Sequence, residues 1–402
     1  MKFLVLVQDL RVSGTSEGIV SRSFLAKLRK IYPEAYIEVH YIIHTDTEDK
    51  LDLLPVNAIT KHLVNSKIPA YVTFLNRFYW RLFHTSLKER YIQKQFANYI
   101  KKIDYKAFDN ILVRSAGINH EMILALKDLP ILKKAIINFH DPYPLTWYYG
   151  GKTKVSALEL FRLKQMMNIV QQVHGITSSA QCMAHDLQQL YAYNKKIFTL
   201  THQYDASVFD WSDRNPIRKK ERNISISYHG ALMFGRNIKN VLWAYEELLL
   251  ENPKYVELTE FILRLRGDGI ANLKEQFRNT ENIKILDCLN FVSSAQEQIQ
   301  ESDIVLILEN GPLYCNTLVG KAPFLAANEK PVLCISPEKS ELRNIIQDER
   351  CIADMNNKNE IKEKLKNLIE NRLVASEQFF PFGNYFSEQN FMKQVKDVIQ
   401  SN

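Results

Sequence analysis

Two basic residues stand where a negatively charged ligand could bind. Arg236 comes just before a helical stretch that begins near Asn237, and a guanidinium beside a helix amino terminus suits a diphosphate. Gly230 ends the apolar run before it and lets the backbone approach a ligand closely. Lys321 follows Gly320 at a loop-to-helix step, ahead of another buried strand. The pattern predicts an anion site, with an ordinary surface arginine as the alternative for Arg236.

The first half of the chain has a small-residue loop directly after its first apolar run. This loop comprises Ser13, Gly14, Thr15, Ser16, Glu17 and Gly18. Its glycines allow close backbone approach to a phosphate or a sugar. The loop does not have the G-x-G-x-x-G pattern, and turns of this composition are common. A ligand-binding loop and a simple turn therefore both remain open.

His140 and Asp141 end another apolar run, "KAIINFHD". Prolines at positions 142 and 144 hold the following backbone extended. A histidine there could donate a hydrogen bond to a sugar hydroxyl or orient an acceptor, or it could simply cap the strand. The sequence shows no catalytic triad, and no His or Cys spacing typical of a protein-bound metal.

The elements that must position these residues alternate between strand and helix. Runs such as "KFLVLV", "NILVRS" and "IVLILEN" lack polar alternation, as in strands buried on both faces of a parallel sheet. A chain of 402 residues exceeds the usual size of one core. We predict an α/β protein with a first domain over 1–205, a linker over 206–222 and a second domain over 223–384. A terminal helix within 385–402 is expected to complete the first domain.

Composition and charge exclude several classes of protein. The chain is 46% hydrophobic and 24% charged, with a formal net charge of +7. This mild charge fits an anionic small ligand or an acidic surface, and no nucleic-acid-binding signature accompanies it. The five cysteines are odd in number and far apart, which predicts reduced thiols. No run has the roughly 18 apolar residues that a membrane-spanning helix needs. We expect a cytoplasmic protein.

The segment 71–102 interleaves aromatic and basic residues and has one acid, Glu89. Basic residues with Trp and Phe suit the headgroup region of an anionic bilayer. The segment therefore predicts either contact with an anionic membrane surface or an amphipathic helix pair packed on the first sheet.

Several motifs, taken in order, resemble the retaining glycosyltransferases of the GT-B fold, in particular the large family-four group. "YHGALMFGRNIKNVLWAYEELL", "LRGDG", "ESDIVLIL" and "GKAPFLAANEKPVL" are similar to consecutive blocks of that family. The resemblance is clearest over 224–337. It departs from the family at the paired glutamates, whose places hold Asn316 and Phe324, and at the usual arginine, replaced by Ala231.

The resemblance implies two Rossmann-like domains facing across a cleft, with a nucleotide-sugar diphosphate bound by the second. The candidate residues are then catalytic His140, Asp141 and Glu309, donor-binding Gly230, Arg236, Asn316, Gly320 and Lys321, and acceptor-side Ser13, Gly14, Thr15 and Gly18.

The expected reaction moves a sugar from a nucleotide-diphosphate donor to a glycan or lipid-linked acceptor, with retention and without a metal or other cofactor. The expected pathway is bacterial surface polysaccharide biosynthesis. The alternatives are a non-catalytic nucleotide-sugar-binding partner of a glycan assembly complex and a nucleotide-sugar epimerase of the same fold.

Overall fold

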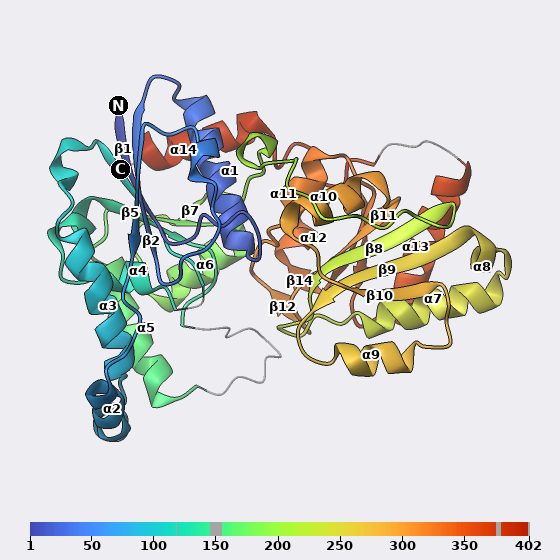
Figure 1. Cartoon of the computed structure of the whole chain (residues 1–402), viewed down its shortest axis with the longest axis horizontal. Coiled ribbons are helices and arrows are strands. Elements are labelled where there is room, and N and C mark those ends of the chain that lie inside the picture. Colours follow the sequence, from blue (N-terminus) through green and yellow to red (C-terminus); the bar gives the residue numbers. More distant parts are fainter. Residues whose placement is uncertain (118, 145–154, 375–378, 401–402) are drawn as a thin grey trace. The chain divides into compact units, whose positions relative to one another are not determined.

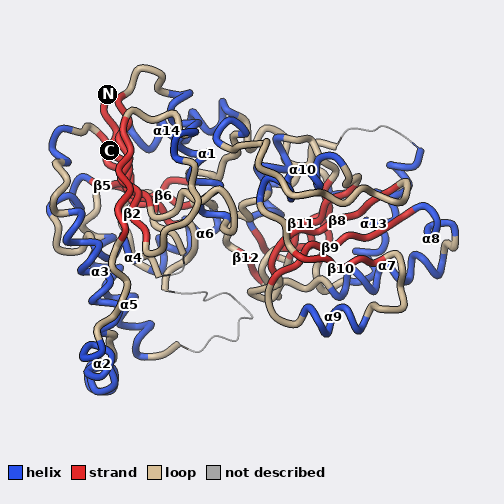
Figure 2. Tube along the Cα trace, viewed as in Figure 1, coloured by secondary structure: helices blue, strands red, loops and turns tan. Residues whose placement is uncertain are grey.

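The computed structural model describes residues 1–117, 119–144, 155–374 and 379–400. The described chain forms two compact units. The first runs from Met1 to Val208 and also includes the residues from Glu388 onward, whereas the second runs from Phe209 to Ser387. The boundary therefore falls within the segment that the sequence marks as a linker, and residues 209–222 are part of the second unit. Each unit has its own parallel sheet (Figure 2).

The first unit is built on a seven-stranded sheet in which every pairing is parallel. Its strands, in spatial order, are β3 (Ala58–Leu63), β2 (Tyr36–Ile43), β1 (Lys2–Val7), β4 (Asn110–Arg114), β5 (Ala135–Phe139), β6 (Gly175–Ser178) and β7 (Phe198–Thr199). The central strands β1, β4 and β5 are buried almost throughout, because helices cover both faces of such a sheet.

The helices of the first unit follow the strands as crossovers. They are α1 (Ser16–Ile31), α2 (Ala70–Phe83), α3 (Leu87–Ile100), α4 (Glu121–Ala125), α5 (Ala157–Val170), α6 (Gln181–Leu190) and α14 (Glu388–Gln400). Local sequence fixes where several begin. Ser86 caps α3, and Ser156 with Glu159 forms a capping box at α5, so orphan N–H groups of the first turn find acceptors.

The second unit repeats this plan with a six-stranded parallel sheet. Its strands, in spatial order, are β10 (Ile283–Asp287), β9 (Thr259–Arg266), β8 (Ile224–Ala231), β11 (Ile304–Leu308), β13 (Val332–Ser336) and β15 (Ile352–Asp354). The two short strands β12 (Tyr314–Cys315) and β14 (Lys339–Ser340) pair beside it. The helices are α7 (Lys239–Glu251), α8 (Lys254–Leu258), α9 (Ile270–Gln276), α10 (Phe291–Gln300), α11 (Ala322–Ala327), α12 (Glu341–Ile345) and α13 (Lys358–Val374).

The terminal helix α14 belongs to the first unit although the whole second unit precedes it in the chain. Figure 1 shows α14 beside α1. The ring of Phe391 meets that of Phe24 edge-on at 6.2 Å, and Val395 and Val398 are buried. Gln394 accepts hydrogen bonds from the backbone N–H and the hydroxyl of Thr201, which follows β7. Residues from the two ends of the sequence thus share one core.

No disulfide joins the cysteines of the described residues, in agreement with their spacing. Cys315, Cys334 and Cys351 are buried, whereas Cys288 is exposed.

Candidate functional site

The carboxyl edge of the second sheet gathers the predicted basic residues. Tyr228 and Gly230 lie at the end of β8, and Lys321 lies at the amino end of α11. The ammonium group of Lys321 sits 4.3 Å from the centre of the Tyr228 ring and donates to the backbone carbonyl of His229. A Cβ on Gly230 would lie 2.9 Å from the Tyr228 hydroxyl and 3.5 Å from Lys321 Nζ. Glycine at this position therefore leaves the space that the Tyr228 hydroxyl occupies.

The ammonium group of Lys321 has neutral partners rather than carboxylates. Burial and, as the second cause, the nearby charge of Arg236 together lower the pKa of Lys321 to about 7. No carboxylate in the described residues forms a salt bridge with Lys321 or Arg236. Two neighbouring cations without counterions favour an anion at this place.

Arg236 is held by the loop that follows β8. Its Nε donates to the side-chain oxygen of Asn310 at 3.1 Å, and Nη1 donates to the carbonyl of Ala231 at 3.2 Å. Asn310 is the second residue after β11 and donates to the Thr317 hydroxyl at 3.5 Å. Sequence reasoning missed both Tyr228 and Asn310. Asn310 could have been found, because it is the polar residue that ends the run "IVLILEN".

Two glycines bring the loops after β8 and β11 together. The backbone of Gly235, at φ +79°, is so near Gly311 that a Cβ on Gly235 would lie 2.7 Å from the Gly311 carbonyl oxygen. The N–H of Gly311 donates to the carbonyl of Phe234 at 3.1 Å. This contact fixes the loop from which Arg236 projects.

The other predicted donor residues lie around the same edge. Gly320 is in the turn that precedes Lys321, and Asn316 is buried directly after β12. Phe324, in the place of a family glutamate, is buried on α11 with its ring 6.1 Å from that of Phe291. It packs in the core rather than offering a polar group to a ligand.

Glu309, predicted as catalytic, is fully buried. Its Oε1 accepts from the backbone N–H of Leu342 in the first turn of α12 at 3.4 Å. Burial raises the pKa of Glu309 to about 7, and the nearby hydroxyls of Ser340 and Ser336 oppose that rise. Its neighbour Asn310 is the residue that holds Arg236.

The predicted acceptor loop begins α1 in the first unit. Thr15 caps the helix by accepting from the N–H of Gly18, and its hydroxyl donates to Asp9 at 2.7 Å. A Cβ on Gly18 would lie 2.5 Å from the carbonyl oxygen of Arg11, so glycine is required for the loop to fold back. At Gly14, with φ +89°, a Cβ would meet nothing within 4 Å, and Ser13 beside it is part-exposed. The tip of the loop therefore has open space beside it.

His140 lies in a buried polar cluster at the carboxyl edge of the first sheet. Neither ring nitrogen has a hydrogen-bond partner, and the ring stacks on that of His202 at 5.5 Å. Burial lowers the pKa of His140 well below its ordinary value, with Arg114 as the next cause. Arg114 is itself buried against the Phe24 ring at 4.2 Å, and burial lowers its pKa to about 9. His140 is thus a neutral imidazole, and the part-exposed Asp141 follows it.

A second polar group at this edge was not predicted. His44, directly after β2, contacts a carboxylate oxygen of Glu121 at 2.5 Å, and Gln8, after β1, donates to the same oxygen at 2.9 Å. Ser115 donates to the side-chain oxygen of Gln8 at 2.9 Å. These residues come from separate strand ends, so only the sheet order reveals that they meet.

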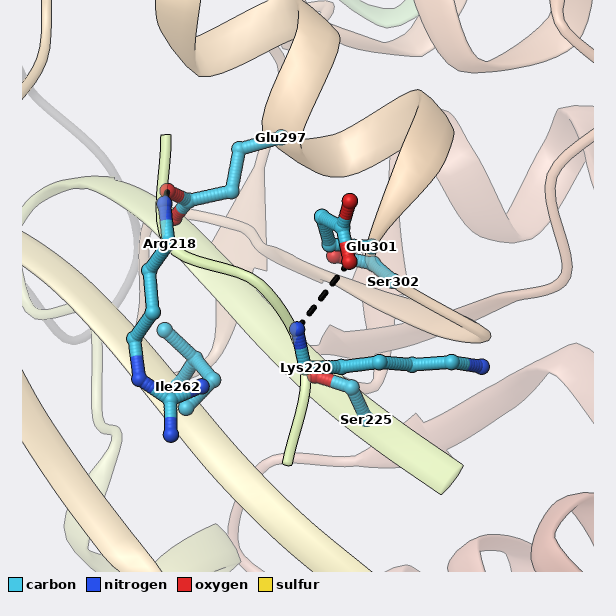
Figure 3. Close-up of a pocket in the computed structure, with 7 residues that line it drawn as sticks. All are labelled: Arg218, Lys220, Ser225, Ile262, Glu297, Glu301 and Ser302. Carbon is cyan, nitrogen blue, oxygen red and sulfur yellow. Dashed lines mark hydrogen bonds between the residues drawn. The ribbon is translucent and has the colours of Figure 1, made fainter. Parts of the chain in front are cut away.

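A small pocket lies at the opposite, amino edge of the second sheet (Figure 3). The backbone N–H of Arg218 donates to Glu297 at 2.9 Å, and that of Lys220 donates to Glu301 at 3.0 Å. The guanidinium of Arg218 also pairs with Glu260 of β9 at 2.9 Å. These contacts attach residues 218–220 to the rest of the second unit.

The described residues contain no group of three or more His, Cys, Asp or Glu side chains able to hold a metal. None of the described helices combines the length and apolar character needed to cross a bilayer.

Comparison with solved structures shows the fold. The chain is similar to the lipopolysaccharide outer core galactosyltransferase WaaB (13% identity, TM-score 0.60, 100% of this chain and 99% of that chain). It is also similar to sucrose-phosphate synthase from Thermosynechococcus elongatus (10% identity, TM-score 0.64, 99% and 95%). A third is UDP-GlcNAc 2-epimerase from Neisseria meningitidis bound to UDP-GlcNAc (14% identity, TM-score 0.56, 100% of both).

No protein-family model and no curated protein matches the sequence. At these identities the likeness to solved structures establishes the GT-B fold with its two Rossmann-like units, which confirms the predicted fold class. The roles predicted for individual site residues are not tested by these comparisons and stay predictions.

Proposed function

We propose that the chain is a glycosyltransferase that moves a sugar from a nucleotide-diphosphate donor to a glycan or lipid-linked acceptor. The observation that carries the proposal is that two basic side chains, Arg236 and Lys321, lie near each other without carboxylate partners at the carboxyl edge of a parallel sheet. Ligands of open α/β sheets bind at this edge. A diphosphate supplies the missing negative charge.

In the proposed reaction Arg236 and Lys321 stabilise the charge that develops on the leaving diphosphate. Gly230 lets the diphosphate approach the end of β8, and Gly320 and Asn316 border it. Glu309, predicted as catalytic, has a fully buried carboxyl group. We therefore propose that it supports the site from behind, next to Asn310. The reaction needs no metal or other cofactor, because the two side chains supply the positive charge. Retention of the anomeric configuration, as the sequence resemblance implies, is part of the proposal and is read from the product by NMR.

The proposed acceptor side lies on the first unit. The loop with Ser13, Gly14, Thr15 and Gly18 has open space at its tip, where an acceptor sugar can approach. His140, neutral and without a hydrogen-bond partner, can donate to or accept from a sugar hydroxyl once a ligand reaches it, and Asp141 lies next to it.

We also propose that the protein acts in the cytoplasm, in the synthesis of a bacterial surface polysaccharide, and that residues 71–102 meet an anionic membrane surface. A role for WaaB in lipopolysaccharide, given by its name, supports the choice of pathway.

A panel of UDP-, GDP- and other nucleotide sugars tests the proposal. A donor that binds only the folded state raises the melting temperature. The donor found in this way is then titrated by calorimetry into wild type, Arg236→Ala and the control Arg278→Ala, whose arginine is exposed and pairs with Glu275. We expect at least a tenfold loss of affinity for Arg236→Ala alone, as for one charged hydrogen bond. Equal affinities for all three proteins would remove Arg236 from the site.

A nucleotide-sugar epimerase is the second candidate, because a UDP-GlcNAc 2-epimerase shares the fold over the full chain. Incubation with donor alone separates the two. An epimerase produces an altered nucleotide sugar without any acceptor, whereas a transferase leaves the donor sugar unchanged or slowly hydrolyses it. If nucleotide sugars of the panel bind but are neither epimerised nor hydrolysed nor used for transfer, the chain would instead be a non-catalytic nucleotide-sugar-binding partner.

A further inference from the structure

Helix α2 presents its apolar stripe to solvent. Tyr71, Phe74, Leu75, Phe78 and Leu82 recur at the spacing that places side chains on one helical face. Their exposed fractions run from 48% for Leu75 to 71% for Leu82. In a surface helix of an ordinary globular protein this stripe faces the core. Here Val72 is the one buried residue of the helix.

The opposite face of α2 attaches the helix to the rest of the first unit. Asn76 accepts from the N–H of Leu87 at 2.7 Å, and the Tyr79 hydroxyl accepts from Arg90 of α3 at 2.9 Å. Helix α3 in turn buries Ile92 and Phe96. Figure 1 shows α2 extending away from the sheet beyond α3. Helix α3 is therefore packed as an ordinary amphipathic helix, whereas α2 projects with its apolar stripe uncovered.

The charges around the stripe are positive. Arg77 and Arg81 are exposed on α2, which contains no acid, and Lys94 is exposed on α3. The single acid of this segment, Glu89, is already paired with Arg162 of α5. An apolar stripe edged by Arg77 and Arg81 matches the boundary between anionic headgroups and acyl chains.

Other occupants fit this surface less well. The helix has 14 residues and is too short to cross a bilayer of roughly 30 Å. A second copy of the chain paired through the same stripe would bring the arginines of both copies to one interface with no carboxylate on α2 to balance them.

We propose that α2 lies in the plane of an anionic lipid surface, with the stripe of Tyr71, Phe74, Leu75, Phe78 and Leu82 in the acyl boundary and the arginines at the headgroups. The helix then anchors the first unit to a membrane. Among the acceptors of the proposed function, this favours a lipid-linked one. The preference for a lipid-linked acceptor rests on the proposed sugar transfer, whereas the lipid binding of α2 does not.

Vesicle co-sedimentation tests the anchor without donor or acceptor. Wild type, the triple variant Phe74→Glu, Phe78→Glu, Leu82→Glu and a matched control are mixed with vesicles of 7:3 phosphatidylcholine and phosphatidylglycerol. The control is Leu250→Glu, Val374→Glu, Phe380→Glu, which adds the same charge at exposed apolar residues of the second unit. We expect at least a tenfold lower partition for the α2 variant and no comparable change for the control.

The contribution of the arginines and the insertion depth of α2 are measured separately. Arg77→Gln with Arg81→Gln should weaken binding to the anionic vesicles and flatten its salt dependence. With Trp80→Phe as the background, a reporter placed in the stripe as Phe78→Trp should shift its fluorescence to the blue on vesicles, and no such shift should occur without the reporter. Equal sedimentation of wild type and the α2 variant would overturn the proposal, as would a concentration-dependent dimer that the α2 substitutions abolish. Lipid binding with no sugar transfer would overturn the proposed function alone.

Discussion

Gly230 lies against the Tyr228 hydroxyl near the end of β8. A Cβ here would lie 2.9 Å from that oxygen, so the Tyr228 side chain, on whose ring the Lys321 ammonium group sits, must move. We expect Gly230→Ala to fold, at a cost of about 1–3 kcal/mol in the free energy of unfolding from overpacking, and to bind nucleotide at least tenfold more weakly. Urea unfolding and calorimetry measure the two effects. Unchanged affinity in a folded Gly230→Ala protein would separate Gly230 from the anion site.

Lys321 predicts a pH dependence of donor binding. Because its pKa is about 7 in the free protein, the lysine is mostly neutral at pH 8 and must take up a proton to face a diphosphate. Affinity should therefore fall as the pH rises above 7, and binding at pH 8 should be accompanied by proton uptake. Calorimetry in buffers of different ionisation enthalpy detects that uptake. Lys321→Gln should abolish it.

The matched control for this experiment is Lys330→Gln. Burial also lowers the pKa of Lys330, whose ammonium group donates to the carbonyl of Ser302 before β11, at the other edge of the sheet. The control should keep both the affinity and the proton uptake of wild type. Wild-type affinity that is flat from pH 6 to 9 would contradict the assignment of Lys321.

Glu309 predicts a pH dependence of stability. Its pKa is about 7 in the folded chain and near 4.5 when unfolded, so the folded state binds more protons between these values. Its contribution to the free energy of unfolding is therefore greatest at low pH and is lost as the pH rises through 7. Glu309→Gln should be more stable than wild type at pH 8, by a few kcal/mol at most, and nearly equal at pH 5.

Chemical denaturation at the two pH values measures this difference. If Glu309→Gln is no more stable than wild type at pH 8, the buried placement of the Glu309 carboxyl group is wrong. Loss of sugar transfer with intact donor affinity in the same variant would instead support the catalytic role that the sequence suggests for Glu309.

Sequence alone predicted that Gly230 ends a strand and that Lys321 begins a helix, because local pattern marks both, whereas Arg236 lies in the loop three residues before α7 and not directly at its start. It could not predict that Lys321 lies on the Tyr228 ring or that Asn310 holds Arg236. These contacts join residues from separate strands, and their meeting depends on the order of strands in the sheet.

At the scale of elements, alternating apolar runs were enough to predict two parallel α/β sheets. The spacing in 71–102 likewise predicted helices, yet it left open whether they pack on the sheet or meet a membrane. Spacing defines an apolar face but not what covers it. Helix α3 is covered by the first unit, whereas α2, with the same kind of pattern, is not.

Helix α1 organises three neighbouring loops through one side chain. The buried Arg22 donates to the carbonyls of Leu10, Lys50 and Val208. Arg22→Met would leave these carbonyls without a donor, and we expect a loss of about 3 kcal/mol in the free energy of unfolding. The exposed pair Arg278 and Glu275 is the comparison, and Arg278→Ala should change stability by less than about 0.5 kcal/mol. Equal stability of Arg22→Met and wild type in urea would refute this account of α1.

At the scale of the whole molecule, removing α14 should damage one unit and spare the other. A chain that stops after Ser387 loses the buried side chains Phe391, Val395 and Val398, each worth about 1.5–3 kcal/mol. Hydrogen exchange should show lost protection in α1 and β7, with the second sheet protected as before. Uniform loss across both units would mean that they fold as one.

The placement of α14 also bears on synthesis. Translation delivers the first sheet early, but its partner for Phe24 emerges only after the whole second unit has left the ribosome. The nascent first sheet must wait, incomplete and with apolar surface uncovered, while almost half of the polypeptide is added. Chains that stall or terminate within the second unit would consequently expose this apolar surface to chaperones and proteases.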